Sequence, residues 1–540
     1  MKKTASFMSK ALLLSGVNIL LRFVAVRFNA FISLKVGAEC MGLFTLVTSV
    51  YGLSVTAATA GIGTAVVKAV SETFALIEKY KDPHPEKRLK KIAVSAVLYS
   101  LIFSVATASV IFFLSEPIGT KLLGDARTVP SLKAFALGLP AVASSAALSG
   151  YFTGVGRVYK NAIVSATEQF AKIAIISFGL ELVLPDGLEW ACLAIVGGGA
   201  LAEGMSLLSS LLLFFSDRSG KKYVGEERVK KTNEFRRVSR LALPIGVGSF
   251  ARQGLITAEH IAIPRELGEY GLGKSEALSA YGTLQGMVMP LVLFPSAVVY
   301  AFAGLLVPEL SACAVLEDEK RIKRIGEKVF RASILFSVCA AAVFICFSGE
   351  IGTGVYKSSE AARQLGIVGF LVPVMYLDSA VDGMLKGLGE QVYCMKVNLI
   401  DSILCLVLVF ILVPRFGIDG YIALMMISEC INFFLSIFKL LKVSHVRFRV
   451  VKWVVMPVSS ALGAWACTSL LSLLLGSVIP FYVKCALFII IYIVFCILTG
   501  SADLSELLSL TSKKTKSVLS PFKRPFMRKK KKVRGIPRTM

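Results

Sequence analysis

Apolar segments of about 20 residues recur from one end of this chain to the other, and they constrain its fold more than any other feature. Each is long enough to cross the hydrocarbon core of a bilayer as an α-helix. A water-soluble chain of this length would divide into several domains with polar surfaces and linkers, yet no long polar domain interrupts these segments. The sequence therefore predicts an all-α polytopic membrane protein.

We expect about fourteen transmembrane helices. The first follows a basic N-terminus, as the apolar region of a signal peptide would, but it continues past Arg22 to about Leu34 with no small-residue cleavage site after it, so we interpret it as uncleaved. The expected spans are 10–34, 41–70, 92–115, 131–150, 161–184, 188–215, 241–264, 277–307, 330–348, 364–385, 392–414, 418–440, 452–477 and 480–500.

Basic residues gather in alternate loops, which predicts the orientation. Lys and Arg favour the cytoplasmic side of a membrane. The basic loops are 79–91, 216–240, 311–331 and 439–452, whereas the loop at 185–189 carries no Lys or Arg. With an even number of spans, this pattern predicts a multi-pass protein of the cytoplasmic membrane with both termini in the cytoplasm.

The two halves of the chain repeat. Residues 139–156 align with 372–389 without gaps at an offset of 233, and both end in a GxxxGxG element whose glycines favour tight turns or close helix contact. Arg22 aligns with Arg252 at an offset of 230. An even number of helices in each half predicts two parallel, pseudo-symmetric six-helix lobes with a substrate site between them.

The repeat also predicts the domain organisation. The two lobes are expected at 1–220 and 241–442, joined by a basic cytoplasmic linker at 221–240. Two further helices are expected at 443–500, followed by a basic cytoplasmic tail at 501–540.

Several stretches resemble the multidrug/oligosaccharidyl-lipid/polysaccharide exporter superfamily, and above all its polysaccharide-exporter branch, which contains stage V sporulation protein B. They are Leu21–Phe23, Gly37–Phe44, Lys68–Glu72, Ser149–Gly154 and Glu168-Gln169. The resemblance covers nearly the whole chain. It implies a V-shaped two-lobe fold that translocates a lipid-linked oligosaccharide or a peptidoglycan precursor, with the two C-terminal helices placed to help hold a lipid tail.

Charged side chains inside spans suggest where a substrate would bind. Such charges cost a few kcal/mol each in lipid and usually face a cavity or a partner. Arg22 and Asn29 share one helix face, and the repeat pairs them with Arg252 and Glu259. Guanidinium groups bind phosphate oxygens bidentately, so the two arginines are candidates to clamp a diphosphate. The alternative is that they snorkel to an interface or make structural hydrogen bonds.

Four further ionisable residues are candidates for roles of their own. Arg27 and Lys68 either face the same cavity or lie near helix ends. Glu203 and Glu429 recur in both halves, and they either carry a coupling proton or ion, or make hydrogen bonds between closely packed helices. Glu168 and Lys172 have the spacing of a structural ion pair on one helix.

Several other functions are unexpected on this sequence. The eleven cysteines show no CxxC spacing and there are three histidines, which argues against a metal site or a disulfide framework. The net charge of +25 lies in loops and in the tail Lys513–Arg538, where it would attract anionic lipids or only fix orientation, so nucleic acid is not an expected partner.

One motif matches a nucleotide-binding pattern letter by letter. Gly268–Ser275 satisfies the P-loop consensus GxxxxGKS, but a working P-loop follows a β-strand in a nucleotide-accessible domain, and this one lies in a short loop predicted to be external. We expect neither ATP nor any other cofactor to bind.

Three classes of function remain to be compared. A flippase or exporter of lipid-linked saccharides fits best. A cation-coupled multidrug exporter of the same fold is the alternative, and it would favour acidic and aromatic cavity linings over paired arginines. A membrane glycosyltransferase or polymerase would need a sizeable external loop for its catalytic group, and no such loop is present, so we do not expect an enzyme.

Overall fold

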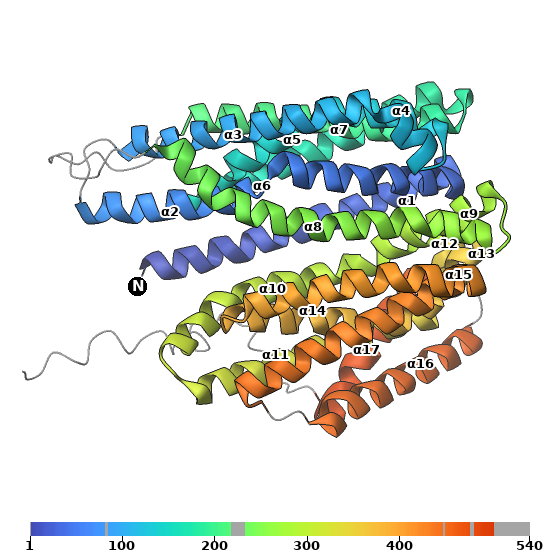
Figure 1. The fold of residues 1–540 in the computed structure, drawn as a ribbon. Coiled ribbons are helices and arrows are strands. Elements are labelled where there is room, and N and C mark those ends of the chain that lie inside the picture. Colours follow the sequence, from blue (N-terminus) through green and yellow to red (C-terminus); the bar gives the residue numbers. More distant parts are fainter. Residues whose placement is uncertain (1, 81–84, 218–232, 447–448, 476–479, 502–540) are drawn as a thin grey trace, which may run out of the picture. The chain divides into compact units, whose positions relative to one another are not determined.

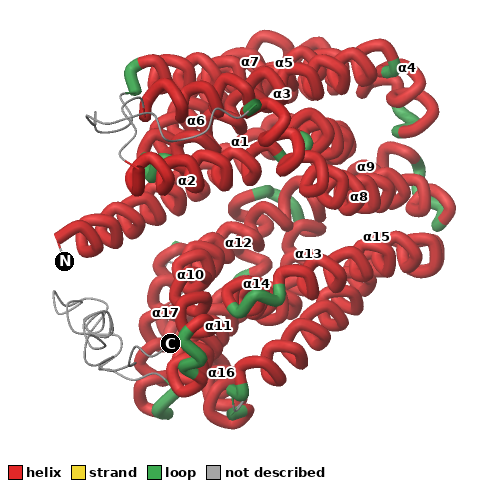
Figure 2. Tube along the Cα trace, turned by 60° about the vertical axis from the view of Figure 1, so that its left-hand side comes forward, coloured by secondary structure: helices red, strands yellow, loops and turns green. Residues whose placement is uncertain are grey.

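The computed structural model describes residues 2–80, 85–217, 233–446, 449–475 and 480–501. These residues form α-helices, short 3-10 helices and π-helices, and no strand occurs among them. Figure 2 shows the helices joined by short loops. The prediction of an all-α membrane protein is confirmed. The basic tail at 502–540 and most of the linker at 221–240 lie outside the described residues.

The first repeat forms seven α-helices and three short 3-10 or π segments. They are α1 (Lys2–Thr59), α2 (Ile62–Tyr80), α3 (Pro85–Phe113), α4 (Ser115–Pro117), η1 (Ile118–Leu122), η2 (Ala126–Thr128), α5 (Val129–Gly154), α6 (Val158–Val183), η3 (Leu184–Asp186) and α7 (Leu188–Phe215).

The second repeat and the two C-terminal helices follow (Figure 1). They are α8 (Glu234–Glu269), α9 (Lys274–Tyr281), η4 (Gly282–Val288), α10 (Met289–Val315), α11 (Glu319–Cys346), α12 (Ser348–Val355), α13 (Ser359–Val368), η5 (Gly369–Leu371), α14 (Val372–Gly387), α15 (Gln391–Ser444), η6 (Val451–Val455), α16 (Met456–Leu475) and α17 (Phe481–Leu498).

The helix count agrees with the expected fourteen spans. Eleven helical segments of the described residues are long and apolar enough to cross a membrane, but two of them, Ile19–Phe74 and Gln391–Ser444, are long enough to cross twice. Each contains a non-helical glycine, Gly37 or Gly417. Counting each as two spans, and adding the more highly charged 36-residue α8, gives fourteen.

The glycines at these two breaks share one requirement, positive φ, and Gly417 has a second. Both take positive φ, 79° at Gly37 and 60° at Gly417, a region that side chains with a Cβ rarely adopt. At Gly417 a Cβ atom would also lie 2.9 Å from the ring of Tyr270. The chain therefore reverses direction at these points with almost no connecting loop.

Contacts divide the chain into two compact units, Met1–Gly326 with Ala340–Val446, and Glu327–Cys339 with Arg447–Met540. In the second unit, Tyr492 donates a hydrogen bond to the Leu335 carbonyl at 3.0 Å, and the rings of Phe330 and Trp453 stack at 6.2 Å. The domain boundaries expected from the repeat stay a prediction.

The glycines of the two GxxxGxG elements serve packing and turns, as expected. A Cβ on Gly154 would lie 2.8 Å from the Val70 side chain of α2, and one on Gly387 would lie 2.9 Å from Leu310 of α10. The last glycine of each element, Gly156 or Gly389, has positive φ at the turn that follows. The repeat is thus visible in the packing of α5 on α2 and of α14 on α10.

A buried ion cluster ties together the ends of α5, α6 and α7 in the first repeat. The Asp217 carboxylate is fully buried, lies 2.6 Å from Lys160 Nζ, and also pairs with Arg157. Tyr151 of α5 donates a hydrogen bond to it at 3.1 Å. Because a buried charge is tolerated only when it is paired and hydrogen-bonded, these partners let the carboxylate remain at this helix end.

The loop charges generate a prediction of topology. In a chain whose eleven native cysteines have been replaced, Lys320→Cys at the start of α11 should resist a membrane-impermeant maleimide added from outside, whereas Lys121→Cys in η1 should react. Both side chains are exposed, so access is set by the side of the membrane. Labelling of position 320 from outside intact cells would contradict the topology.

Candidate functional site

Arg252 lies near the middle of α8 and is oriented by a second helix. Its Nη2 donates a hydrogen bond to Asn398 Oδ1 of α15 at 2.9 Å, and the Asn398 amide in turn donates to the Cys394 carbonyl at 2.7 Å. The charge of Asp401, on the same helix, also interacts with Arg252. Arg252 remains exposed with this partner in place, so other donor groups of its guanidinium are available to a ligand.

The other three basic candidates, Arg22, Arg27 and Lys68, are also exposed. Arg22 and Arg27 lie on the first part of α1, before the break at Gly37, and Lys68 lies on α2. The predicted clamp of Arg22 with Arg252 stays a prediction.

The repeat-equivalent residues Asn29 and Glu259 have unlike surroundings. The Asn29 amide donates a hydrogen bond to the Gly286 carbonyl of η4 at 2.8 Å, which joins the two repeats. Glu259 is 9% exposed and lies beside Tyr421, whose hydroxyl also accepts a hydrogen bond from Gln285 at 2.7 Å. Both side chains therefore have partners within the protein, and their predicted role beside the arginines stays a prediction.

Five carboxylates gather in the second repeat, which we call the acidic cluster. Its members interact electrostatically with one another across α8, α14 and both parts of α15: Glu259, Asp378, Asp382, Asp401 and Glu429. Ser428 donates a hydrogen bond to Asp401 and lies 2.9 Å from Cys405 Sγ. Glu429, one of the two acidic residues singled out in the sequence, therefore belongs to a larger group.

Two buried acceptors in this cluster are unsatisfied. Asp378 and Asn432 are 9% and 7% exposed, and the Asn432 amide lies 3.4 Å from Asp378 Oδ2. Asp378 Oδ1 and Asn432 Oδ1 have no hydrogen-bond partner among the described residues. Within the same residues, no three His, Cys, Asp or Glu side chains are arranged to hold a metal ion.

Glu203 in the first repeat has a smaller set of neighbours. The Tyr51 hydroxyl hydrogen-bonds to it, and the charges of Glu168 and Lys172 act on it. The expected pair between Glu168 and Lys172 is not among the ion pairs of the described residues; Lys172 instead lies where its charge offsets those of two carboxylates. Glu203 has Lys172 as a basic neighbour, and the acidic cluster has two basic neighbours: Arg252 beside Asp401, and Lys386, whose Nζ lies 3.1 Å from Asp382 Oδ2.

Sequence reasoning missed most of the acidic cluster. Asp378, Asp382 and Asp401 all lie within apolar spans, so the cost of intramembrane charge was a signal that applied to them as much as to Glu429. Their approach to Glu259 depends on how α8 packs on α15, which spacing along the chain does not reveal.

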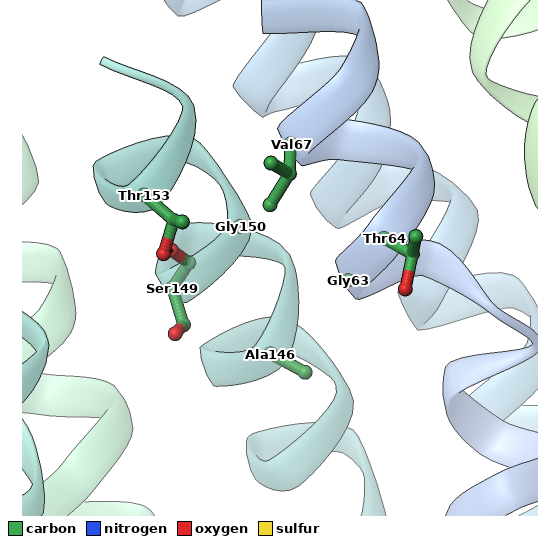
Figure 3. Close-up of a pocket in the computed structure, with 7 residues that line it drawn as sticks. All are labelled: Gly63, Thr64, Val67, Ala146, Ser149, Gly150 and Thr153. Carbon is green, nitrogen blue, oxygen red and sulfur yellow. Dashed lines mark hydrogen bonds between the residues drawn. The ribbon is translucent and has the colours of Figure 1, made fainter. Parts of the chain in front are cut away.

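A cavity of about 410 Å³ that is shallow and largely open, rather than enclosed, lies between α2 and α5. Figure 3 shows its small side chains, with the hydroxyls of Ser149 and Thr153 on one helix and that of Thr64 on the other. The lining is completed by Gly63, Val67, Ala146 and Gly150. This cavity lies one helical turn from Lys68, the exposed basic candidate of the same helix.

The P-loop-like stretch has the wrong context for a nucleotide. It spans the end of α8 and the start of α9, and no strand precedes it in this described part of the chain. Lys274 Nζ lies 3.7 Å from the Asp125 carboxylate, and Ser275 Oγ donates to Glu39 Oε2 at 2.7 Å. Two carboxylates at this position would repel a phosphate.

The comparisons with known proteins decide the family. Residues 7–313, more than half of the chain, match the family model described as polysaccharide biosynthesis protein. The chain belongs to the polysaccharide biosynthesis protein family. The chain is also similar to stage V sporulation protein B of Bacillus subtilis (strain 168), at 24% identity over 423 residues, with 77% of this chain and 80% of that protein covered.

Solved structures agree with the fold of this family member. The lipid II flippase MurJ in an inward closed conformation matches with a TM-score of 0.65 at 15% identity, covering 90% of this chain and 98% of that one. An inward-facing MATE family multidrug transporter of the MOP superfamily matches with a TM-score of 0.61 at 12% identity, covering 80% and 100%. The chain is a multi-pass membrane protein, and it shares the fold of these two transporters.

The surroundings of Lys274 generate a prediction about nucleotides. Lys274→Ala should change neither the affinity of the purified protein for ATP nor its transport rate, because an ion pair this long and 63% exposed on the lysine contributes little. Calorimetric titration with Mg-ATP checks the first point. Saturable ATP binding that disappears in the variant would reveal a phosphate site.

Proposed function

We propose that this chain moves a lipid-linked oligosaccharide or a peptidoglycan precursor across the cytoplasmic membrane by alternating access. Support comes from the family, whose name concerns polysaccharide biosynthesis, and from the flippase fold. In this proposal both termini lie in the cytoplasm, the basic tail contacts anionic lipids, and the chain neither binds ATP nor catalyses a covalent reaction.

The observation that carries the proposal is the exposed guanidinium of Arg252 in the middle of a spanning helix. An uncompensated cation at this depth costs several kcal/mol unless it meets water, a partner or a ligand. Asn398 accepts a hydrogen bond from Nη2 of Arg252 and so orients the guanidinium. The other N–H groups of the planar guanidinium are then available to two phosphate oxygens. Arg22, at the equivalent point of the first repeat, is also exposed.

Lys68, Arg27 and the cavity between α2 and α5 extend this binding surface in the first repeat. The cavity offers the hydroxyls of Thr64 and Ser149, which suit the hydroxyls of a sugar better than an apolar drug, whereas the Thr153 hydroxyl is bonded to the Ser149 carbonyl and Asn161. Asn29 and Glu259 are better placed to hold helices together than to contact the headgroup, because each already has protein partners.

Removing either arginine tests the diphosphate clamp. Arg22→Ala and Arg252→Ala should each lower flipping of a diphosphate-linked saccharide lipid by about 100-fold, the effect of losing charge-assisted hydrogen bonds in a desolvated site. Lys at either position should recover part of the rate, because it restores charge without the fork. The measurement is a flipping assay in proteoliposomes.

The matched control is Lys121→Ala, which removes an exposed basic residue of η1 far from both positions in the sequence and should flip at the normal rate. Thermal unfolding and yield of each variant show whether insertion and folding are intact. Near-normal rates in both arginine variants would refute the clamp and leave the arginines as structural or interfacial charges.

We also propose that the acidic cluster, including Glu429, couples transport to a proton gradient, with Glu203 as the weaker candidate. Carboxylates this close in a medium of low dielectric constant repel one another, so they are neutralised by shared protons or by a cation. Asp378 Oδ1 and Asn432 Oδ1 are buried without a donor, which a carboxyl proton would supply. The same cluster would serve a cation-coupled multidrug exporter, the second candidate function.

Neutral variants of the cluster test the coupling. In proteoliposomes with an imposed pH difference, Glu429→Gln and Asp378→Asn should make the transport rate independent of the gradient, because no carboxyl proton is then exchanged at these positions. Glu203→Gln, matched in chemistry, should keep the dependence. Loss of the dependence only in Glu203→Gln would move coupling to the first repeat, and its persistence in all three would exclude these carboxylates. Repeating the assay with a cationic drug separates the exporter from the flippase.

A further inference from the structure

A compact ion and hydrogen-bond cluster joins the two repeats near the break in α1. Arg127 of η2 donates from Nη1 to Glu39 Oε1 at 2.9 Å and from Nη2 to Asp125 Oδ2 at 2.7 Å. The second oxygen of Glu39 accepts a hydrogen bond from Ser275 of α9 at 2.7 Å. Glu39, Asp125 and Arg127 belong to the first repeat and Ser275 to the second, so this last bond crosses between them.

Asp125 and Arg127 hold Glu39 in position to accept the hydrogen bond from Ser275. The Asp125 side chain is 4% exposed, and although burial alone would raise its pKa, hydrogen bonds and charge from Arg127 hold the pKa below its ordinary value. Asp125 therefore stays ionised and fixes the Arg127 fork, which in turn presents Glu39 to Ser275. Lys274 of the second repeat pairs with Asp125 over a longer distance, with its exposed ammonium 3.7 Å from the carboxylate.

Close contacts between glycines and the facing backbone form another part of this junction. A Cβ on Gly42 of α1 would lie 2.1 Å from the Leu278 carbonyl of α9, and one on Gly282 of η4 would lie 2.1 Å from the Ala38 carbonyl. Asn29 adds its hydrogen bond to Gly286 in the same π-helix. Figure 1 shows α9 beside the end of α1 that carries this junction. Apolar side chains are buried beside these glycines as well, among them Met41 of α1 and Leu278 of α9, so the junction combines apolar packing with polar contacts.

We propose that Glu39, held by Arg127 and Asp125 and engaged by Ser275, is a reversible latch that keeps the external ends of the two repeats together and must open in each transport cycle. The inference rests on the proposed alternating-access function and on the predicted topology, in which this junction is external. Alternating access requires the junction to part when the substrate leaves. The Ser275 bond, the long Lys274–Asp125 pair, the Asn29 bond to Gly286 and the backbone contacts cross it, whereas the Arg127 pairs move with the first repeat.

Reversible cross-linking tests whether opening is required. In a chain with its eleven native cysteines replaced, Glu39→Cys with Ser275→Cys is joined by a short bis-methanethiosulfonate and then released with a reductant. We expect cross-linking to lower flipping of a diphosphate-linked saccharide lipid at least tenfold, and the reductant to restore it. The matched control is Lys35→Cys with Glu181→Cys, an ion pair of 3.3 Å within the first repeat, whose cross-link should leave the rate unchanged. Unchanged flipping across a complete Glu39–Ser275 cross-link would overturn the latch.

Hydrogen–deuterium exchange tests the latch without any substrate. In lipid nanodiscs, Ser275→Ala and Glu39→Gln should raise exchange of the peptide covering 274–288 about tenfold, because a hydrogen bond to a charged group no longer opposes opening. Lys274→Ala should leave it unchanged. Equal exchange in the wild-type, Ser275→Ala and Glu39→Gln proteins would overturn the latch. Faster exchange in a protein that does not flip the chosen lipid would uphold the latch and count against the proposed substrate.

Discussion

The cost of charge in hydrocarbon is the constraint on which the rest of this structure depends. Each backbone polar group inside a bilayer must be satisfied within its own segment, which leaves helices as the only form for these spans. The same cost makes each intramembrane charge informative. Arg252 is held by Asn398, and Glu203 has a tyrosine and a lysine for neighbours, so both charges are accommodated by specific partners.

The fold was predictable because the length and hydropathy of each span can be read from that span alone. Each span contains its own signal, and Gly37 and Gly417 permit reversals so tight that two helices follow each other almost without a loop. The repeat was also predictable from short stretches of sequence, because the GxxxGxG elements have the same packing and turn roles in both halves. What stayed unpredictable was how equivalent residues differ: Asn29 bonds across to η4, whereas Glu259 is buried beside Tyr421.

Contacts between distant segments account for the parts of the site that were not predicted. Ser275 and Glu39 are 236 residues apart, and nothing in either local sequence indicates that they meet. The stretch around Ser275 instead matches the consensus of a nucleotide-binding motif. In the structure its lysine and serine face carboxylates, and it is this electrostatic setting, rather than the order of letters, that determines what such a loop can bind.

Helix α8 connects the elements that a transport cycle must coordinate. Its first turns pack into the apolar core of the first repeat, where Val238 and Ala242 are fully buried among residues of α2, α3 and α5. Further along, Thr257 donates a hydrogen bond to the Ser49 carbonyl of α1. The same helix carries Arg252 and Glu259, and so reaches both the candidate phosphate contact and the acidic cluster. Glu259 therefore lies on a helix that contacts both repeats, through Asn398 of α15 in the second and Ser49 of α1 in the first. In the proposed transport cycle, a helix bonded to both repeats would carry an electrostatic change in one of them to the other, with no need for contact between the acidic cluster and the substrate.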